Sequence, residues 1–209
     1  MEQINFWIGI VATMAFAITG VLAIADRGVD LFGILVLGVI TAIGGGTLRD
    51  IILDVPAFWS VSQIYFWLAV VACTLTFFAE SFFTRPQIYQ GMLYIDGLGA
   101  ALFAIQGADK AWSLGFGLPL APVILGVVTA IGGGLIRDVL AGRKTLLMSH
   151  ELYAIPVTFG CAAYVLILNY LPQYAPEGSV ICILAIFGLR SAAIRWDLRV
   201  PNRFITRMR

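Results

Sequence analysis

Two copies of the motif Gly-Gly-Gly-x-x-Arg-Asp carry the residues best suited to chemistry. The first copy ends in Arg49 and Asp50, and the second ends in Arg137 and Asp138. Ionisable side chains within a membrane span usually face the interior of a bundle or an aqueous cavity. Consecutive residues point about 100° apart on a helix, so we expect each arginine and its neighbouring aspartate to have separate partners. Two interpretations stay open: each pair lines one mouth of an hourglass-shaped passage, or each arginine extends to the membrane surface and anchors a helix end.

Each motif begins with three glycines, Gly44 to Gly46 and Gly132 to Gly134. An interior glycine weakens a helix by about 1 kcal/mol relative to alanine, so two triplets need a compensating use. One use is a kink or unwound turn that frees backbone carbonyls to line a pore; the other is close helix packing through small residues. The matching pair of triplets, each followed by Arg-Asp, favours a pathway. Free carbonyls suit a cation and free amides suit an anion, so these residues alone leave the charge of the permeant species open.

Further polar residues near the motif complete the predicted pathway. Thr41 and Thr129 lie one turn before the triplets, and each either offers its hydroxyl to an ion or bonds a carbonyl of its own helix. Asp96 is either a buried carboxylate or a cap near a helix end, and Arg190 is expected to extend toward lipid headgroups. The predicted ion-pathway residues are Thr41, Gly44, Gly45, Gly46, Arg49, Asp50, Thr129, Gly132, Gly133, Gly134, Arg137 and Asp138, with Thr19, Asp96 and Gln106 as weaker candidates.

The motif belongs to a longer internal repeat. Residues 38–52 and 126–140 match at an offset of 88, with ten of fifteen positions identical. A second match, 16–20 with 103–107, lies one helix earlier at an offset of 87. The repeat unit is therefore three helices, and because three is odd, the second copy crosses the membrane in the opposite direction. Inverted repeats often place an ion or substrate site near the bilayer midplane, where we expect the two glycine triplets to approach each other.

The composition excludes most soluble proteins. Of the 209 residues, 60% are hydrophobic and 12% are charged, and the mean hydropathy is +0.94, whereas a soluble domain has about a quarter charged residues. Apolar stretches long enough to cross a bilayer predict seven helices within residues 3–25, 31–48, 55–79, 91–108, 111–136, 152–176 and 178–195. We expect an all-α polytopic membrane protein with a first three-helix repeat in 1–86, a second, inverted three-helix repeat in 87–174, and a seventh helix with a basic tail in 175–209.

The basic residues predict the orientation, because they accumulate on the cytoplasmic side of a membrane. With the N-terminus outside, eleven of the thirteen lysines and arginines are cytoplasmic and only Arg49 and Lys110 lie outside. The C-terminus is then cytoplasmic, in a multi-pass protein of the cell membrane, which is the inner membrane in a bacterium. The basic tail from Arg195 to Arg209 predicts contact with anionic lipid headgroups. The net charge of +1 gives no reason to expect nucleic acid.

Other reactive residue types support neither catalysis nor metal binding. The three cysteines stand singly in apolar stretches, and His150 is the sole histidine, so we expect no metal site and no cofactor. No nucleophile–base pair and no phosphate-binding loop is recognisable. We therefore expect no catalytic residues, and a protein that is not an enzyme.

The duplicated motif, the matching segments 16–20 and 103–107, and the lone seventh helix resemble the prokaryotic branch of the TRIC (trimeric intracellular cation) channel family. The resemblance covers nearly the whole chain. It implies seven helices with the N-terminus outside, a homotrimer, and a separate pore through each protomer. It also implies a pore that is gated around glycine kinks in the second and fifth helices, here Gly44 to Gly46 and Gly132 to Gly134, and that passes potassium and other monovalent cations. The same domain is also described as a glycine transporter family.

Three functions are thus in competition. The first is a passive cation channel, and the second is a carrier for a small zwitterion such as glycine that uses the same interrupted helices in an alternating-access cycle. A weaker third is a structural or lipid-binding membrane protein. Unitary currents with a potassium reversal potential favour the channel, and saturable counter-flow of glycine without such currents favours the carrier.

Overall fold

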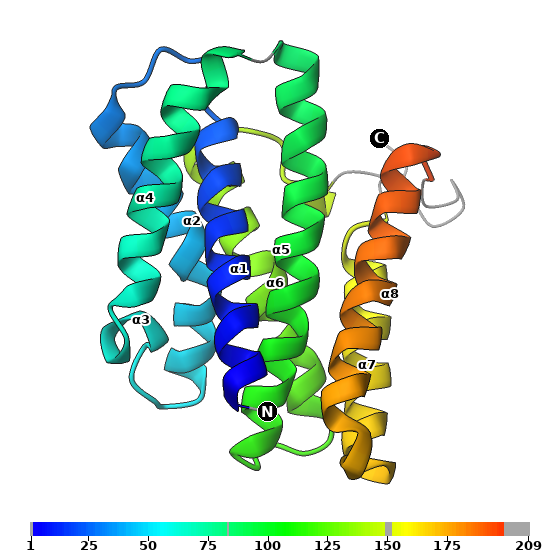
Figure 1. Cartoon of the computed structure of the whole chain (residues 1–209). Coiled ribbons are helices and arrows are strands. Elements are labelled where there is room, and N and C mark those ends of the chain that lie inside the picture. Colours follow the sequence, from blue (N-terminus) through cyan, green and yellow to red (C-terminus); the bar gives the residue numbers. More distant parts are fainter. Residues whose placement is uncertain (1, 83, 149–151, 199–209) are drawn as a thin grey trace, which may run out of the picture.

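The computed structural model describes residues 2–82, 84–148 and 152–198 of the chain. This described part is all-helical and folds into one bundle (Figure 1). Its eight α-helices are α1 (Glu2–Leu22), α2 (Leu31–Ile52), α3 (Phe58–Val61), α4 (Ile64–Ala79), α5 (Arg85–Ser113), α6 (Leu120–Leu140), α7 (Ala154–Tyr170) and α8 (Ala175–Arg195). His150 and most of the basic tail lie outside the described residues.

The helices differ in length from the predicted spans. Within the described residues, five helices, α1, α2, α5, α6 and α8, are long and apolar enough to cross a membrane. The helices α4 and α7 are apolar but shorter, with 16 and 17 residues. The predicted span within 55–79 is divided, because the four-residue α3 precedes α4. The helix predicted within 91–108 is longer than expected: α5 has 29 residues and begins at Arg85, beside Pro86.

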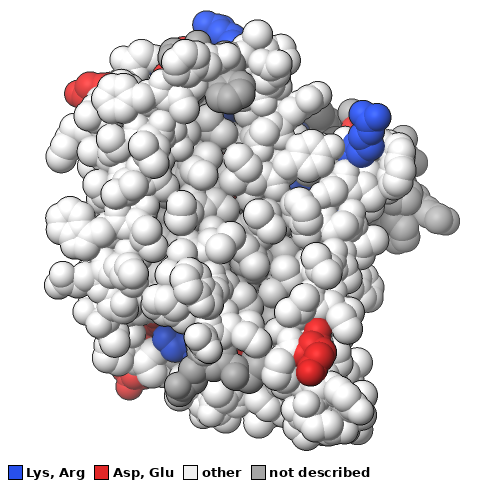
Figure 2. Space-filling model, in the orientation of Figure 1, with Lys and Arg blue, Asp and Glu red and all other residues white. Residues whose placement is uncertain are grey.

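Charge marks the two ends of the bundle. In Figure 2 the charged side chains of the described residues gather near the two ends of the visible face, and uncharged side chains cover the band between them. Exposed large apolar residues such as Phe32, Phe78 and Phe159 contribute to the surface. A soluble protein rarely exposes so much contiguous apolar surface, and a bundle in lipid does so by necessity.

Three helices pack in the same way twice. In the first set α1, α2 and α4 all contact one another, and in the second set α5, α6 and α7 do the same. The sets join where α1 packs on α5 and α2 packs on α6, while α8 covers α5 and α7. Alanine is the commonest residue of the buried core, in which the larger rings of Phe16 and Phe103 stack at 5.5 Å between their centroids.

Candidate functional site

The two glycine triplets meet where α2 crosses α6. A Cβ atom added to Gly45 would overlap the carbonyl oxygen of Thr129, and one added to Gly133 would overlap that of Thr41. These two contacts are equivalent, since each residue of one pair is 88 positions from its counterpart in the other. A Cβ on Gly132 would lie 3.1 Å from the Cα of Gly45. The backbones of α2 and α6 therefore touch directly, and a side chain at these positions would force them apart.

The unwound turn considered from the sequence does not occur in this conformation. Both α2 and α6 continue as α-helix through their triplets. The physical reason is that glycine here permits close backbone approach, which needs no broken helical hydrogen bonds. The nearby hydroxyls are also used within their own helices: Thr41 Oγ1 donates to Leu37 O at 2.7 Å, and Thr129 Oγ1 donates to Leu125 O at 2.5 Å. The weaker candidate Thr19 likewise bonds Phe16 O at 2.9 Å.

At the end of α2, the Asp50 carboxylate accepts three hydrogen bonds. We call Asp50 with the side chains of Arg49 and Lys110 and the N–H of Phe58 the Asp50 cluster. Asp50 Oδ1 accepts from Arg49 Nε and from Lys110 Nζ, both at 2.8 Å, and its Oδ2 accepts from the backbone N–H of Phe58 at 2.8 Å. The carboxylate is fully buried and Arg49 is 2% exposed. The cluster therefore ties α2 to α5 and fixes the chain that leads into α3.

At the end of α6, the Asp138 cluster repeats this arrangement at an offset of 88. Asp138 Oδ1 accepts from Arg137 Nε at 2.9 Å, and Oδ2 accepts from the backbone N–H of Leu146 at 3.0 Å. Arg137 Nη1 also donates to Asp96 Oδ1 at 2.7 Å. The weaker candidate Asp96 is thus a buried partner of Arg137 rather than a helix cap, since it lies well inside α5.

The clusters correct two expectations about the Arg-Asp pairs. Each arginine does bond its neighbouring aspartate, because the long side chain folds back across the 100° between the two positions. Neither Arg49 nor Arg137 extends to the surface, since both are buried. The two clusters lie at opposite ends of the bundle. The Asp50 cluster is near Asn5, at the start of α1. The Asp138 cluster is near the other end of α1, because Arg143, whose N–H bonds Asp138 O, donates from Nη1 to Ala23 O.

Arg190 is a third buried arginine, and the expectation that it meets lipid headgroups is wrong. Its Cζ lies 4.6 Å from the ring centroid of Tyr153, and its Nη1 donates to Leu152 O at 3.1 Å. The reason is the packing of α8 on α5, where a Cβ on Gly97 would lie 3.5 Å from the Cβ of Arg190. Stacking of guanidinium on an aromatic ring is favourable when both are desolvated.

A polar cavity of about 190 Å³ adjoins the Asp50 cluster. Arg49, Lys110, Tyr65 and Gln106 line it, and Gln106 Nε2 donates to Asn5 O at 2.9 Å. This places Gln106 at the cavity wall, while its sequence counterpart Thr19 is bonded within its own helix.

A row of aromatic rings leads from the cavity toward the glycine crossing. Phe58 lines the cavity, and its ring centroid lies 6.5 Å from that of Phe103, which stacks on Phe16. A Cβ on Gly46 would come within 2.5 Å of the Phe58 ring, and one on Gly133 within 3.6 Å of Phe16. We call Phe58, Phe103 and Phe16 the aromatic barrier. Its rings lie beside the glycine crossing, because Phe58 borders Gly46 and Phe16 borders Gly133.

Sequence reasoning missed several residues of this site. Lys110 stood out only as a charge outside the predicted membrane, and Phe58 and Leu146 contribute backbone N–H groups, which no residue type reveals. Phe16 and Phe103 had a signal that was not used, since they are the first residues of the two matching segments 16–20 and 103–107.

Comparisons with known proteins agree over most of the chain. A family model described as "Glycine transporter" matches it twice, at residues 6–81 and 93–169. The "UPF0126 inner membrane protein YadS" of Escherichia coli K12 is 39% identical over 94% of this chain and 95% of its own length. The "UPF0126 membrane protein YvgT" of Bacillus subtilis is 34% identical over 94% of this chain and 95% of its own.

Solved structures with a similar fold exist. The TRIC trimeric intracellular cation channel orthologue from Rhodobacter sphaeroides superimposes with a TM-score of 0.88 and 30% identity, covering 94% of this chain and 100% of that one. A prokaryotic TRIC channel crystallised in 0.5 M KCl gives a TM-score of 0.87 and 28% identity, covering 96% and 100%.

Proposed function

We propose a passive cation channel as the function of this chain, which belongs to the glycine transporter family of membrane proteins. The chain is an integral protein of the cell membrane, which is the inner membrane in Gram-negative relatives. One observation carries the proposal: two buried polar clusters stand at opposite ends of the α2–α6 pair, in a fold shared over almost the whole chain with cation channels.

The proposed topology has seven spans, formed by α1, α2, α4, α5, α6, α7 and α8, with the N-terminus outside and the C-terminus cytoplasmic. The two three-helix repeats are residues 1–86 and 87–174, and the seventh helix and tail are 175–209. Like the similar trimeric channels, the protein forms a homotrimer with one pore in each protomer. The tail binds anionic lipids on the cytoplasmic face.

The proposed route for the ion starts at the cavity beside the Asp50 cluster and ends at the Asp138 cluster. Between them the aromatic barrier closes the route in this conformation, because apolar rings offer an ion nothing to replace its water. Buried atoms without hydrogen-bond partners in the described structure flank the route, among them Arg49 Nη1 and Asp96 Oδ2. Such atoms are costly unless water or an ion contacts them at some stage of the cycle.

Opening is proposed to occur at the glycine crossing. The direct backbone contact between Gly45 and Gly133 lets α2 and α6 slide or tilt without dragging side chains past each other. A small shift there moves Phe58 and Phe16, since both rings border the glycines of the triplets. The Asp138 cluster, with the carboxylates of Asp96 and Asp138 around one guanidinium, carries the net negative charge that favours a cation, and potassium is the proposed main permeant ion.

Single-channel recording tests the proposal. Purified protein is fused into planar bilayers under a potassium chloride gradient, and the expected result is unitary current that reverses near the potassium equilibrium potential. Absence of unitary current, together with saturable glycine counter-flow in proteoliposomes, would refute it.

The glycine carrier remains the second candidate, favoured by the description of the matching family model. The carrier would use the same contact between α2 and α6. Free glycine would then pass the membrane only when the aromatic barrier and one cluster open in turn. The recording and counter-flow experiments on the same preparation separate the two.

A further inference from the structure

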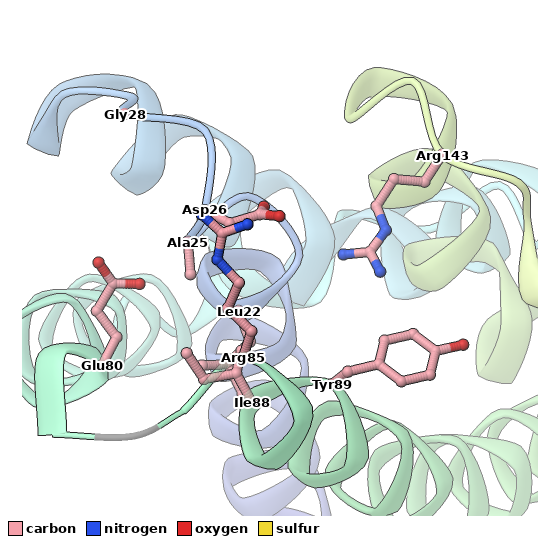
Figure 3. Close-up of a pocket in the computed structure, with 9 residues that line it drawn as sticks. All are labelled: Leu22, Ala25, Asp26, Gly28, Glu80, Arg85, Ile88, Tyr89 and Arg143. Carbon is pink, nitrogen blue, oxygen red and sulfur yellow. The ribbon is translucent and has the colours of Figure 1, made fainter.

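A second charged cavity lies away from the α2–α6 route. It has a volume of about 360 Å³ and is formed by the end of α1, the end of α4, the start of α5 and the turn after α6. Four charged side chains, Asp26, Glu80, Arg85 and Arg143, line it from these separate segments (Figure 3). The function proposed above uses none of them.

The acidic residues of this cavity lack a cationic partner. Within the described residues neither Asp26 nor Glu80 forms an ion pair, and Glu80 Oε2 is buried without a hydrogen-bond partner. Burial, and then the nearby charge of Asp26, raises the pKa of the Glu80 carboxyl. A cation placed between the two carboxylates would give the buried oxygen of Glu80 a partner and would offset the repulsion between Glu80 and Asp26.

The basic residues of the cavity, Arg85 and Arg143, keep donors available for a ligand. The Arg143 guanidinium donates from Nη1 to Ala23 O at 2.7 Å, and its Cζ lies 5.7 Å from the ring centroid of Tyr89. Arg85 rises from the first residue of α5 into the cavity (Figure 3) and is exposed. Guanidinium groups presented in this way suit phosphate oxygens.

An apolar groove of about 390 Å³ adjoins the charged cavity. The two share Leu22, Glu80 and Ile88 among their lining residues. The groove runs between α1, α4 and α5, and Ile18, Leu75 and Ile95 form part of its apolar wall. A charged head space that continues into an apolar groove has the form of a site for an amphiphile.

We infer that the cavity and groove together bind a phospholipid whose headgroup carries both a primary amine and a phosphate. The amine lies between Asp26 and Glu80, the phosphate contacts Arg85 and Arg143, and an acyl chain follows the groove. Both signs of charge in the cavity fit a zwitterion better than an anionic headgroup, which would face two carboxylates. The groove favours a lipid over a soluble phosphoamine. A primary amine donates hydrogen bonds to Glu80, whereas a quaternary amine has none to donate.

Competition among lipids tests this directly. Delipidated protein is incubated with an equimolar mixture of phosphatidylethanolamine, phosphatidylcholine and phosphatidylglycerol, and the lipids retained are counted by native mass spectrometry. We expect phosphatidylethanolamine to be retained about tenfold over phosphatidylcholine, the ratio given by one charge-assisted hydrogen bond. Equal retention, or stronger retention of phosphatidylglycerol, would overturn the inference. A protein that retains no phospholipid would also overturn it, in favour of a groove covered by a second copy of the chain.

Variants assign the contacts. Glu80→Gln should remove the preference over phosphatidylcholine, Asp26→Asn should weaken it, and Arg85→Gln should lower retention of all three lipids. Glu177→Gln is the matched control, because this exposed carboxyl in the first turn of α8 lies outside the cavity. A preference that persists in both Glu80→Gln and Asp26→Asn would contradict the assignment of the amine. Lipid retention is measured without any ionic current, so the outcome of this test does not depend on whether the protein is a channel.

Discussion

Replacing Gly45 with alanine tests how tightly α2 and α6 are packed. A Cβ there would overlap the carbonyl oxygen of Thr129 and lie 3.1 Å from the amide nitrogen of Gly133. Both are backbone atoms of α6, which cannot swing aside as a side chain can, so the helices must separate by roughly 1 Å. A gap of that size forfeits roughly a quarter to a half of the dispersion attraction at the contact. Overpacking of this kind costs about 1–3 kcal/mol.

Two other glycines provide matched controls. Gly188 in α8 has no atom within 4 Å of an added Cβ, so alanine there should only gain helix propensity, about 1 kcal/mol. The same gain applies to Gly45→Ala, so the difference between the two variants isolates the packing cost. Gly44→Ala should be milder than Gly45→Ala, because its Cβ would meet Ile136 Cδ1 at 2.8 Å, the movable end of a flexible side chain.

The free energy of unfolding is measured in mixed micelles by titration with sodium dodecyl sulfate, followed by circular dichroism. We expect Gly45→Ala to be less stable than Gly188→Ala by about 1–3 kcal/mol. Gly133→Ala should behave like Gly45→Ala, and the double variant should lose less than the sum, because the first substitution has already separated the helices. If Gly45→Ala is as stable as Gly188→Ala, or if the two crossing substitutions are strictly additive, the close crossing described here is wrong.

Three further predictions address the barrier and the clusters. Phe103→Ala should raise the open probability in planar bilayers by removing a ring of the aromatic barrier, whereas Phe159→Ala, on the exposed face of α7, should leave it unchanged. Asp50→Asn should lower the free energy of unfolding by about 3–5 kcal/mol, because it leaves buried Arg49 without its carboxylate; a loss below 1 kcal/mol would contradict this. Lys110→Gln, with its side chain 30% exposed, should cost under about 1 kcal/mol. It should also raise cation conductance at low salt, an effect that shrinks above about 0.1 M, where the Debye length is about 10 Å, and equal conductance at all salt concentrations would count against a charge effect.

The sequence predicted the helical class and the pairing of the two motifs because both depend on local patterns. Apolar stretches between charges locate helices, and the offset of 88 between Gly45 and Gly133 already implied that they meet. Residue types could not show how long side chains fold, so the bond from Arg49 to Asp50 was missed. They also could not show which face of α8 packs inward, and for this reason Arg190 was wrongly assigned to the surface.

The helix boundaries show the same limit. The start of α3 at Phe58 is held by the bond from its N–H to Asp50 Oδ2, a contact across eight residues that hydropathy does not record. From the sequence, each glycine triplet could lie either in a broken helix or in an intact one. Only the position of Thr129 O beside Gly45 distinguishes the two.

The two ends of the molecule are built alike but are not equal. The Asp50 cluster includes an extra amine from Lys110, whereas the Asp138 cluster includes an extra carboxylate from Asp96. An ion in the proposed route would therefore meet different charges from the two sides. We expect the proposed pore to rectify, so that at equal and opposite voltages the inward and outward currents differ in size.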